Sequence, residues 1–272
     1  MSVINTNVKS IMAQNALATN NRSLTKSMEQ LSTGKRINSA ADDAAGLAIT
    51  SRMQAQIRGL NQAVRNANDA VSMMQTAEGA TKEITNMLER MRELAVQAAN
   101  DTYGADDRTA IDKEVDQLAE EITRIGTNTE WNGKKVLETA GTYTFQVGSG
   151  STSTSAVDVT MVTMSASALT VSSLDVSSFT LAQESIGKLD TAIKAVDEFR
   201  ATLGAKINRM TSAADNLSNI SMNTAASRSR IEDADYAQAT TELARTQIIQ
   251  QAATAMLAQA NQQPQAVLSL LK

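Results

Sequence analysis

The chain has 272 residues, a formal net charge of −4 and an isoelectric point near 5.1, and it contains no cysteine and no histidine. These absences exclude disulfides, thiolate nucleophiles, Cys/His metal sites and imidazole catalysis. The acidic balance argues against a general nucleic-acid binder, because such proteins present a basic face. Aromatic residues make up only 3%, which favours thin, alanine-rich helix contacts over a rounded aromatic core.

Residues 1–36 carry apolar side chains at helical spacing, a pattern typical of a coiled-coil seam. Asparagines at several positions lower its helix propensity, so we expect this helix to be marginal alone and to form on docking. The pattern leaves two interpretations open, an ordinary bundle helix and an assembly segment. Gly34 is expected to end the helix. The apolar positions are Ile4, Val8, Ile11, Leu17, Leu24, Met28 and Leu31.

The next stretch, residues 37–46, has the composition of a turn that leads into a second helix. Asn38, Ser39, Asp42 and Asp43 are cap and turn residues. The paired carboxylates lack further ligands nearby in the sequence, so we interpret them as caps and not as a metal or acid–base site.

A helix resumes at Leu47, and from Gly59 to Asn100 its apolar or small residues recur every three or four positions without proline. That spacing keeps one stripe on one side of the helix. At 1.5 Å per residue, about forty residues span roughly 60 Å. So long a helix needs partner helices along its length, and residues 111–125 and 186–217 repeat the same spacing.

The middle of the chain changes character. Asn132-Gly133 predicts a tight hairpin turn, and residues 142–147 alternate as a strand does. From Ser149 to Thr180, sixteen of 32 positions are Ser or Thr, which indicates a small exposed β insertion or a flexible loop. Two interpretations of these hydroxyls stay open, O-glycan attachment and unmodified β-forming residues. The candidate O-glycosylation positions are Ser149, Ser151, Thr152, Ser153, Thr154, Ser155, Ser172, Ser173, Ser177 and Ser178.

The C-terminal segment, residues 230–272, returns to helical periodicity. Pro264 is expected to bend or restart this helix. The apolar residues at its end have no apolar residues nearby in the sequence against which they could be buried. The apolar positions that we assign to an inner coiled coil here are Ile249, Met256, Val267, Leu268 and Leu271.

The whole pattern predicts a mainly α fold: an elongated bundle of long helices with terminal coiled-coil helices and a small β hairpin in the middle. We expect five segments along the chain. They are an N-terminal inner coiled coil (1–45), the N-terminal part of the long bundle with its hairpin (46–140), a short variable outer region (141–182), the C-terminal part of the bundle (183–228) and a C-terminal inner coiled coil (229–272).

Several long motifs, in order, resemble bacterial flagellin. Together they frame residues 1–140 and 183–272, and the short middle resembles a flagellin with a reduced central region. Motifs of this length and order are far more specific than one short motif. They begin Ile4-Asn-Thr-Asn-Val, Leu31-Ser-Thr-Gly-Lys-Arg-Ile-Asn, Met91-Arg-Glu-Leu-Ala-Val-Gln, Trp131-Asn-Gly-Lys-Lys-Val-Leu, Arg228-Ser-Arg-Ile-Glu-Asp-Ala-Asp-Tyr and Ala258-Gln-Ala-Asn-Gln-Gln-Pro.

The resemblance implies a subunit that polymerises with its own copies into the flagellar filament used for swimming. It implies secretion through the flagellar type III apparatus, which fits an N-terminus without a signal-peptide pattern. The implied partners are an export chaperone on Leu243 to Leu271, the filament cap and the hook–filament junction proteins. Neither a cofactor, nor nucleic acid, nor insertion into a membrane is expected.

The resemblance also implies recognition by a host Toll-like receptor. The positions that match the family's receptor contacts are Arg90, Leu94 and Glu114, and we expect Leu94 to be exposed on the free subunit. Spacing alone would make Arg90 an ordinary solvated charge.

Three alternatives are weighed against the filament subunit. A hook–filament junction protein of the same family would match less well at the C-terminus. A cytoplasmic coiled-coil adaptor, from a different class, would form stable helical monomers or dimers in dilute buffer. An enzyme has little support, since the sequence shows no phosphate-binding loop, nucleophile–base pair or metal cluster.

Overall fold

The computed structural model describes residues 6–150, 152 and 155–269, without the side chains of residues 263–269. Its contacts divide the chain into two compact units. Unit 1 comprises Met1–Ala55 and Asn223–Lys272, and unit 2 comprises Gln56–Met222. The prediction of a mainly α chain with a small β hairpin in its middle is confirmed. The division into five segments stays a prediction.

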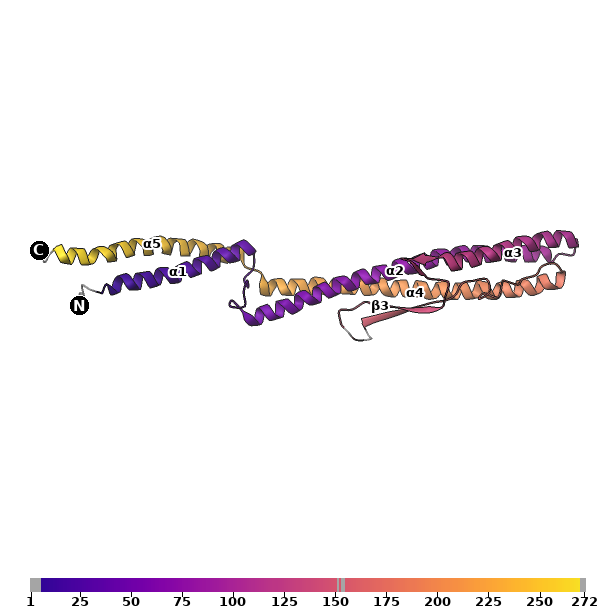
Figure 1. The fold of residues 1–272 in the computed structure, drawn as a ribbon, viewed down its shortest axis with the longest axis horizontal. Coiled ribbons are helices and arrows are strands. Elements are labelled where there is room, and N and C mark those ends of the chain that lie inside the picture. The colour runs from indigo at the N-terminus through magenta and orange to yellow at the C-terminus, as the bar shows by residue number, and fades with distance from the viewer. Residues whose placement is uncertain (1–5, 151, 153–154, 270–272) are drawn as a thin grey trace. The chain divides into compact units, whose positions relative to one another are not determined.

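Two helices dominate unit 1, α1 (Val8–Thr33) and α5 (Tyr236–Ser269), and they pack side by side (Figure 1). The backbone N–H of Ser10 donates to the side chain of Asn7, which caps the start of α1. Gly34 ends α1 with a positive φ of 70°, as its position predicted. The helix α5 runs through Pro264 to Ser269, so the expectation that this proline interrupts the helix is wrong.

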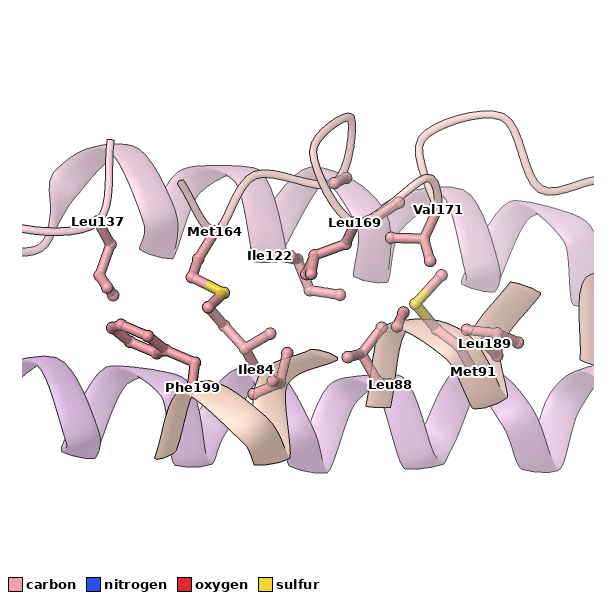
Figure 2. Packing of buried hydrophobic residues seen from close by; sticks show 14 of the residues in the cluster. Ile84, Leu88, Met91, Ile122, Leu137, Met164, Leu169, Val171, Leu189 and Phe199 are labelled. Carbon is pink, nitrogen blue, oxygen red and sulfur yellow. The ribbon is translucent and has the colours of Figure 1, made fainter. Parts of the chain in front are cut away.

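Unit 2 is built along α2 (Ala44–Ala98) and α4 (Phe179–Glu232), of which it holds the parts between residues 56 and 222. The third helix, α3 (Ala105–Asn128), contributes buried residues to the same core as α2 and α4. Most residues of the predicted α2 stripe are buried, with Val64 and Val71 half-buried. In Figure 2, Ile84, Leu88 and Met91 meet side chains from the other elements in this core.

Two hairpins follow α3. Strands β1 (Glu130–Trp131) and β2 (Lys134–Lys135) pair across Asn132 and Gly133, which both have positive φ, so the predicted tight turn is confirmed. Strands β3 (Gly141–Gln146) and β4 (Ala156–Met161) form the second antiparallel hairpin, with Gly141 opposite Met161. Side chains of β3 alternate between half-buried and exposed, as predicted.

The Ser/Thr-rich middle is packed more closely than its composition suggested. Residues 156–176 contribute nine buried apolar side chains to the unit 2 core, so the expectation of an exposed insertion or a flexible loop is wrong for this part. Backbone groups anchor it as well, since the N–H of Met164 donates to the carbonyl of Leu137 at 2.9 Å. The buried residues are Val157, Val159, Met161, Met164, Ala166, Leu169, Val171, Leu174 and Val176.

Candidate assembly surfaces

The contact between α1 and α5 in unit 1 is narrow and partly polar. The side-chain amide of Asn20, itself buried, donates to the carbonyl of Thr246 at 2.8 Å, and the hydroxyl of Ser10 donates to the amide oxygen of Asn261 at 2.9 Å. Leu24 and Leu31, two of the predicted seam positions, are half-buried. The seam thus alternates leucines, which bury apolar area, with polar residues, which specify register. On α1 the seam comprises Ser10, Ala13, Leu17, Asn20, Leu24, Ser27 and Leu31.

Several large apolar side chains of these two helices lie outside that seam. Ile248 is 67% exposed, and the other members of the set are between two-fifths and two-thirds exposed. Four of them, Val8, Ile11, Ile249 and Met256, were predicted as polymerisation positions of the inner coiled coil, and that role stays a prediction; in the single chain they are exposed. We call the set the terminal apolar residues: Val8, Ile11 and Met12 of α1, and Ile248, Ile249 and Met256 of α5.

Two hollows accompany the α1–α5 contact. Met12 and Met256 line one of them together with Lys9, and Ile249 lines the other together with Ala16. Met12 and Ala16 are four residues apart on α1, and Ile249 and Met256 are seven apart on α5, so each pair shares a helix face. The two hollows therefore form one side of the helix pair. Among the other positions predicted for the inner coiled coil, Ile4 and Leu271 lie outside the described residues. Val267 and Leu268 lie in α5, but their side chains are not described.

A network of charged groups fixes the loop between α1 and α2 within unit 1. Lys26 and Asp42 form an ion pair at 2.8 Å, and Lys35 and Glu232 form another at 2.6 Å. The hydrogen bond with Lys26, and then those from Ser39, hold the pKa of Asp42 far below its usual range. The predicted turn and cap roles are confirmed: the carboxylate of Asp42 accepts the backbone N–H of Ser39 within the turn, and that of Asp43 accepts the backbone N–H of Gly46 at the start of α2.

The predicted receptor positions separate into a surface pair and a core residue. Arg90 of α2 donates to Glu114 of α3 at 2.9 and 3.2 Å and to Glu93 at 3.1 Å, and these bonds raise the pKa of its guanidinium. Arg90 and Glu114 are each about half exposed. Leu94, in contrast, is 2% exposed and belongs to the unit 2 core. The expectation that Leu94 is exposed is wrong, because its position falls on the buried stripe next to Ala95.

The hydroxyls predicted as glycan attachment points are unequal. Five are exposed: Ser149, Thr152, Ser172, Ser173 and Ser177. Ser155 and Ser178 are half-buried, and Ser178 accepts the backbone N–H of Leu181 at the start of α4. Ser151, Ser153 and Thr154 lie outside the described residues.

A cluster of carboxylates around Asp116 in unit 2 was not predicted from the sequence. Burial raises the pKa of Asp116, and the neighbouring carboxylates of Asp112, Glu120 and Asp175 raise it further. Asp175 is 59 positions away in the chain, so no local pattern reveals this cluster. Within the described part of the chain, no group of three or more acidic side chains is arranged to hold a metal ion.

Long helices whose apolar side chains stay exposed near both ends of the chain define a self-associating helical subunit. None of the helices in the described ranges combines the length and the apolar character that crossing a membrane requires. The α1–α5 seam leaves the exposed apolar side chains of both helices available to other molecules.

Comparisons of the sequence with known proteins identify the family of this chain. The family model of the bacterial flagellin N-terminal helical region matches residues 4–144, and that of the C-terminal helical region matches residues 186–271. A flagellin of Halalkalibacterium halodurans is 48% identical over 271 residues, covering 99% of this chain and all of the relative. The flagellar filament 33 kDa core protein of Treponema phagedenis is 41% identical, with 99% of this chain and all of the relative covered.

Among solved structures, the crystal structure of Bacillus cereus flagellin is similar, with a TM-score of 0.50 and 35% identity. It covers 56% of this chain and 88% of that one. The chain belongs to the bacterial flagellin family, and its function is that of a structural subunit of the flagellar filament.

Proposed function

We propose that this subunit is exported and polymerises with its own copies outside the cell, and that the terminal apolar residues form the contacts between copies. The observation that carries the proposal is their exposure on α1 and α5, outside a seam that leucines and hydrogen-bonded polar side chains already fill. Complete burial of one such side chain stabilises an assembly by about 1.5–3 kcal/mol. Six of them repeated in every subunit supply a large driving force for a polymer.

One substitution pair tests this proposal. Ile248→Gln removes an apolar contact from α5, and Val162→Gln makes the same chemical change at an exposed apolar residue of unit 2. Neither change should alter the free energy of unfolding by more than about 0.5 kcal/mol, since both positions are exposed in the free subunit.

The readout is the concentration of unpolymerised protein that remains after seeding, measured by sedimentation. Losing about 1.4 kcal/mol or more of contact energy raises it about tenfold or more for Ile248→Gln. Val162→Gln should polymerise like the wild type. Equal polymerisation of the two variants would contradict the assignment of the contacts to the terminal apolar residues.

The same exposed side chains support the proposal that an export chaperone covers the segment from Leu243 to Leu271 before assembly. Ile248 and Ile249 would otherwise associate prematurely. A purified chaperone should therefore bind Ile248→Gln more weakly than Val162→Gln, as measured by titration calorimetry. The filament cap and the hook–filament junction proteins are the proposed partners of subunits at the filament ends.

A Toll-like receptor is the proposed host partner of the free subunit, through Arg90 and Glu114. Their charges lie side by side on α2 and α3 and are half exposed, which makes them accessible to a partner. Arg90→Ala should lower receptor activation at equal monomer concentration. Arg124→Ala, which removes an exposed arginine paired within α3, is the matched control. Equal activation by the two variants would argue against this contact.

O-glycosylation is proposed for the exposed hydroxyls of Ser149, Thr152, Ser172, Ser173 and Ser177. Their exposure would let a transferase reach them in the folded subunit. Mass measurement of the intact chain from native filaments, followed by peptide mapping, tests this. An intact mass equal to the sequence mass would refute it.

A further inference from the structure

Among the described methionines, a buried set and an exposed set stand apart, with Met53 and Met87 half-buried between them. Six are buried in unit 2, each 3% exposed or less, where they fill gaps in the core. Four others among the described residues are exposed, and three of these lie on the helices of unit 1. The buried set is Met73, Met74, Met91, Met161, Met164 and Met210, and the exposed set is Met12, Met28, Met222 and Met256.

Two of the exposed methionines, one on α1 and one on α5, line the same hollow beside the contact of these helices. Met12 is 66% exposed and Met256 is 61% exposed, and both line the same surface hollow beside Ala13 and Ala260. Their small neighbours leave the side chains open to water and to small solutes. Each methionine also belongs to the terminal apolar residues, so assembly would cover it.

We propose that Met12 and Met256 form an oxidation-sensitive site whose reactant is hydrogen peroxide, and that their oxidation in the free subunit blocks polymerisation. This inference rests on the proposed role of the terminal apolar residues. The thioether sulfur attacks one peroxide oxygen, the O–O bond breaks and an S=O bond forms. The sulfur loses two electrons, and the peroxide is reduced to water.

The consequence follows from the polarity of the product. A sulfoxide is a strong hydrogen-bond acceptor in place of an apolar thioether, and it disrupts apolar interfaces. In an interface of apolar side chains the new oxygen finds no donor, which penalises its burial. Oxidation would therefore keep the subunit monomeric without unfolding unit 2, and reduction by methionine sulfoxide reductases would restore assembly.

The experiment compares full-length wild type, the double variant Met12→Leu/Met256→Leu and Met222→Leu. Met222 is a fair control because it is 59% exposed but lies in unit 2. Leucine has a volume and helix propensity close to those of methionine and cannot form a sulfoxide. Monomers are treated with hydrogen peroxide, mapped by peptide mass spectrometry and then seeded, and each protein is compared with its own untreated sample.

We expect peroxide to raise the unpolymerised concentration about tenfold in the wild type and in Met222→Leu, the size of effect that one unpaired buried acceptor produces. The double variant should change less than about twofold, because it keeps apolar side chains at both positions. Reductase treatment should restore the wild type. An equal loss in the double variant would overturn the proposal, as would normal polymerisation of a wild type oxidised at Met12 and Met256.

The failure of the proposed function itself would look different. Untreated Ile248→Gln would then polymerise as well as untreated Val162→Gln. The rates of oxidation then still test whether Met12 and Met256 form an oxidation-sensitive site. Both should be oxidised well before the six core methionines, and equal rates would overturn the inference.

Discussion

A single added methyl group at Gly126 should destabilise unit 2. Gly126 is buried in α3, and a Cβ atom there would lie 2.3 Å from the carbonyl oxygen of Met164 and 2.9 Å from its carbonyl carbon. Ordinary contact begins near 3.4 Å, so the backbone of the Met164 segment must move by about 1 Å. That movement strains the bond between Met164 N–H and the Leu137 carbonyl.

The expected change in the free energy of unfolding for Gly126→Ala is the sum of opposing contributions. Alanine is favoured over glycine inside a helix by about 1 kcal/mol. Overpacking costs about 1–3 kcal/mol, and weakening one backbone hydrogen bond costs about 1 kcal/mol more. Gly126→Ala should therefore lower the free energy of unfolding by about 1–3 kcal/mol. Gly204→Ala in α4 is the matched control, because nothing lies within 4 Å of its added Cβ, and it should stabilise by about 0.5–1 kcal/mol.

Urea unfolding followed by the fluorescence of Trp131 is the assay. Trp131 is the only tryptophan of the chain and is half-buried against the unit 2 core, so its signal reports this unit. The two variants should shift the unfolding midpoint in opposite directions with unchanged slope. If Gly126→Ala is as stable as Gly204→Ala, the close packing of the Met164 segment on α3 is refuted.

Two further predictions use the same full-length protein. Leu94→Ala should lower the free energy of unfolding by about 2–5 kcal/mol, because it leaves a cavity in the core. The control, Val96→Ala at an exposed position of the same helix, should change it by less than about 0.5 kcal/mol. Equal effects of the two substitutions would contradict the burial of Leu94. The lowered pKa of Asp42 means that its contribution to stability is complete above the unfolded-state pKa of about 4 and is lost as the pH falls toward the folded-state value. The protection factor of the Ser39 amide, which is the intrinsic exchange rate at each pH divided by the observed rate, should therefore fall below about pH 4. In Asp42→Asn the protection factor should be low at every pH; the same fall below about pH 4 in that variant would contradict the role of the Lys26–Asp42 pair.

Much of the fold could be predicted because it depends on local periodicity. The three–four spacing along α2 and α4 and the Asn132-Gly133 turn each act within a few residues, so the helices and hairpin follow from the sequence. Helix ends were less certain. Gly126 resembles a terminator in sequence, yet α3 continues to Asn128 because packing against Met164 requires a residue without a side chain there.

The candidate surfaces needed tertiary information. Spacing placed Val8 and Ile11 in a seam, but a helix with apolar and small residues on more than one side has more than one candidate seam. The hydrogen bonds of Ser10 and Asn20 to α5 decide which side faces inward. Likewise, Arg90 and Leu94 are neighbours on a motif, but one turn of helix separates a solvated charge from a core side chain.

By itself, the sequence determined the fold class, because sparse aromatics and long uninterrupted helical periodicity predict an elongated helical bundle, and its long motifs resemble those of bacterial flagellin, which implies a filament subunit. Only the tertiary structure decided which side chains remain available for assembly. Helical periodicity fixes the direction in which each side chain points from its own helix. The exposure of a side chain depends on which face of the helix a partner helix covers. Contacts between residues as distant in sequence as Asn20 and Thr246 determine that face.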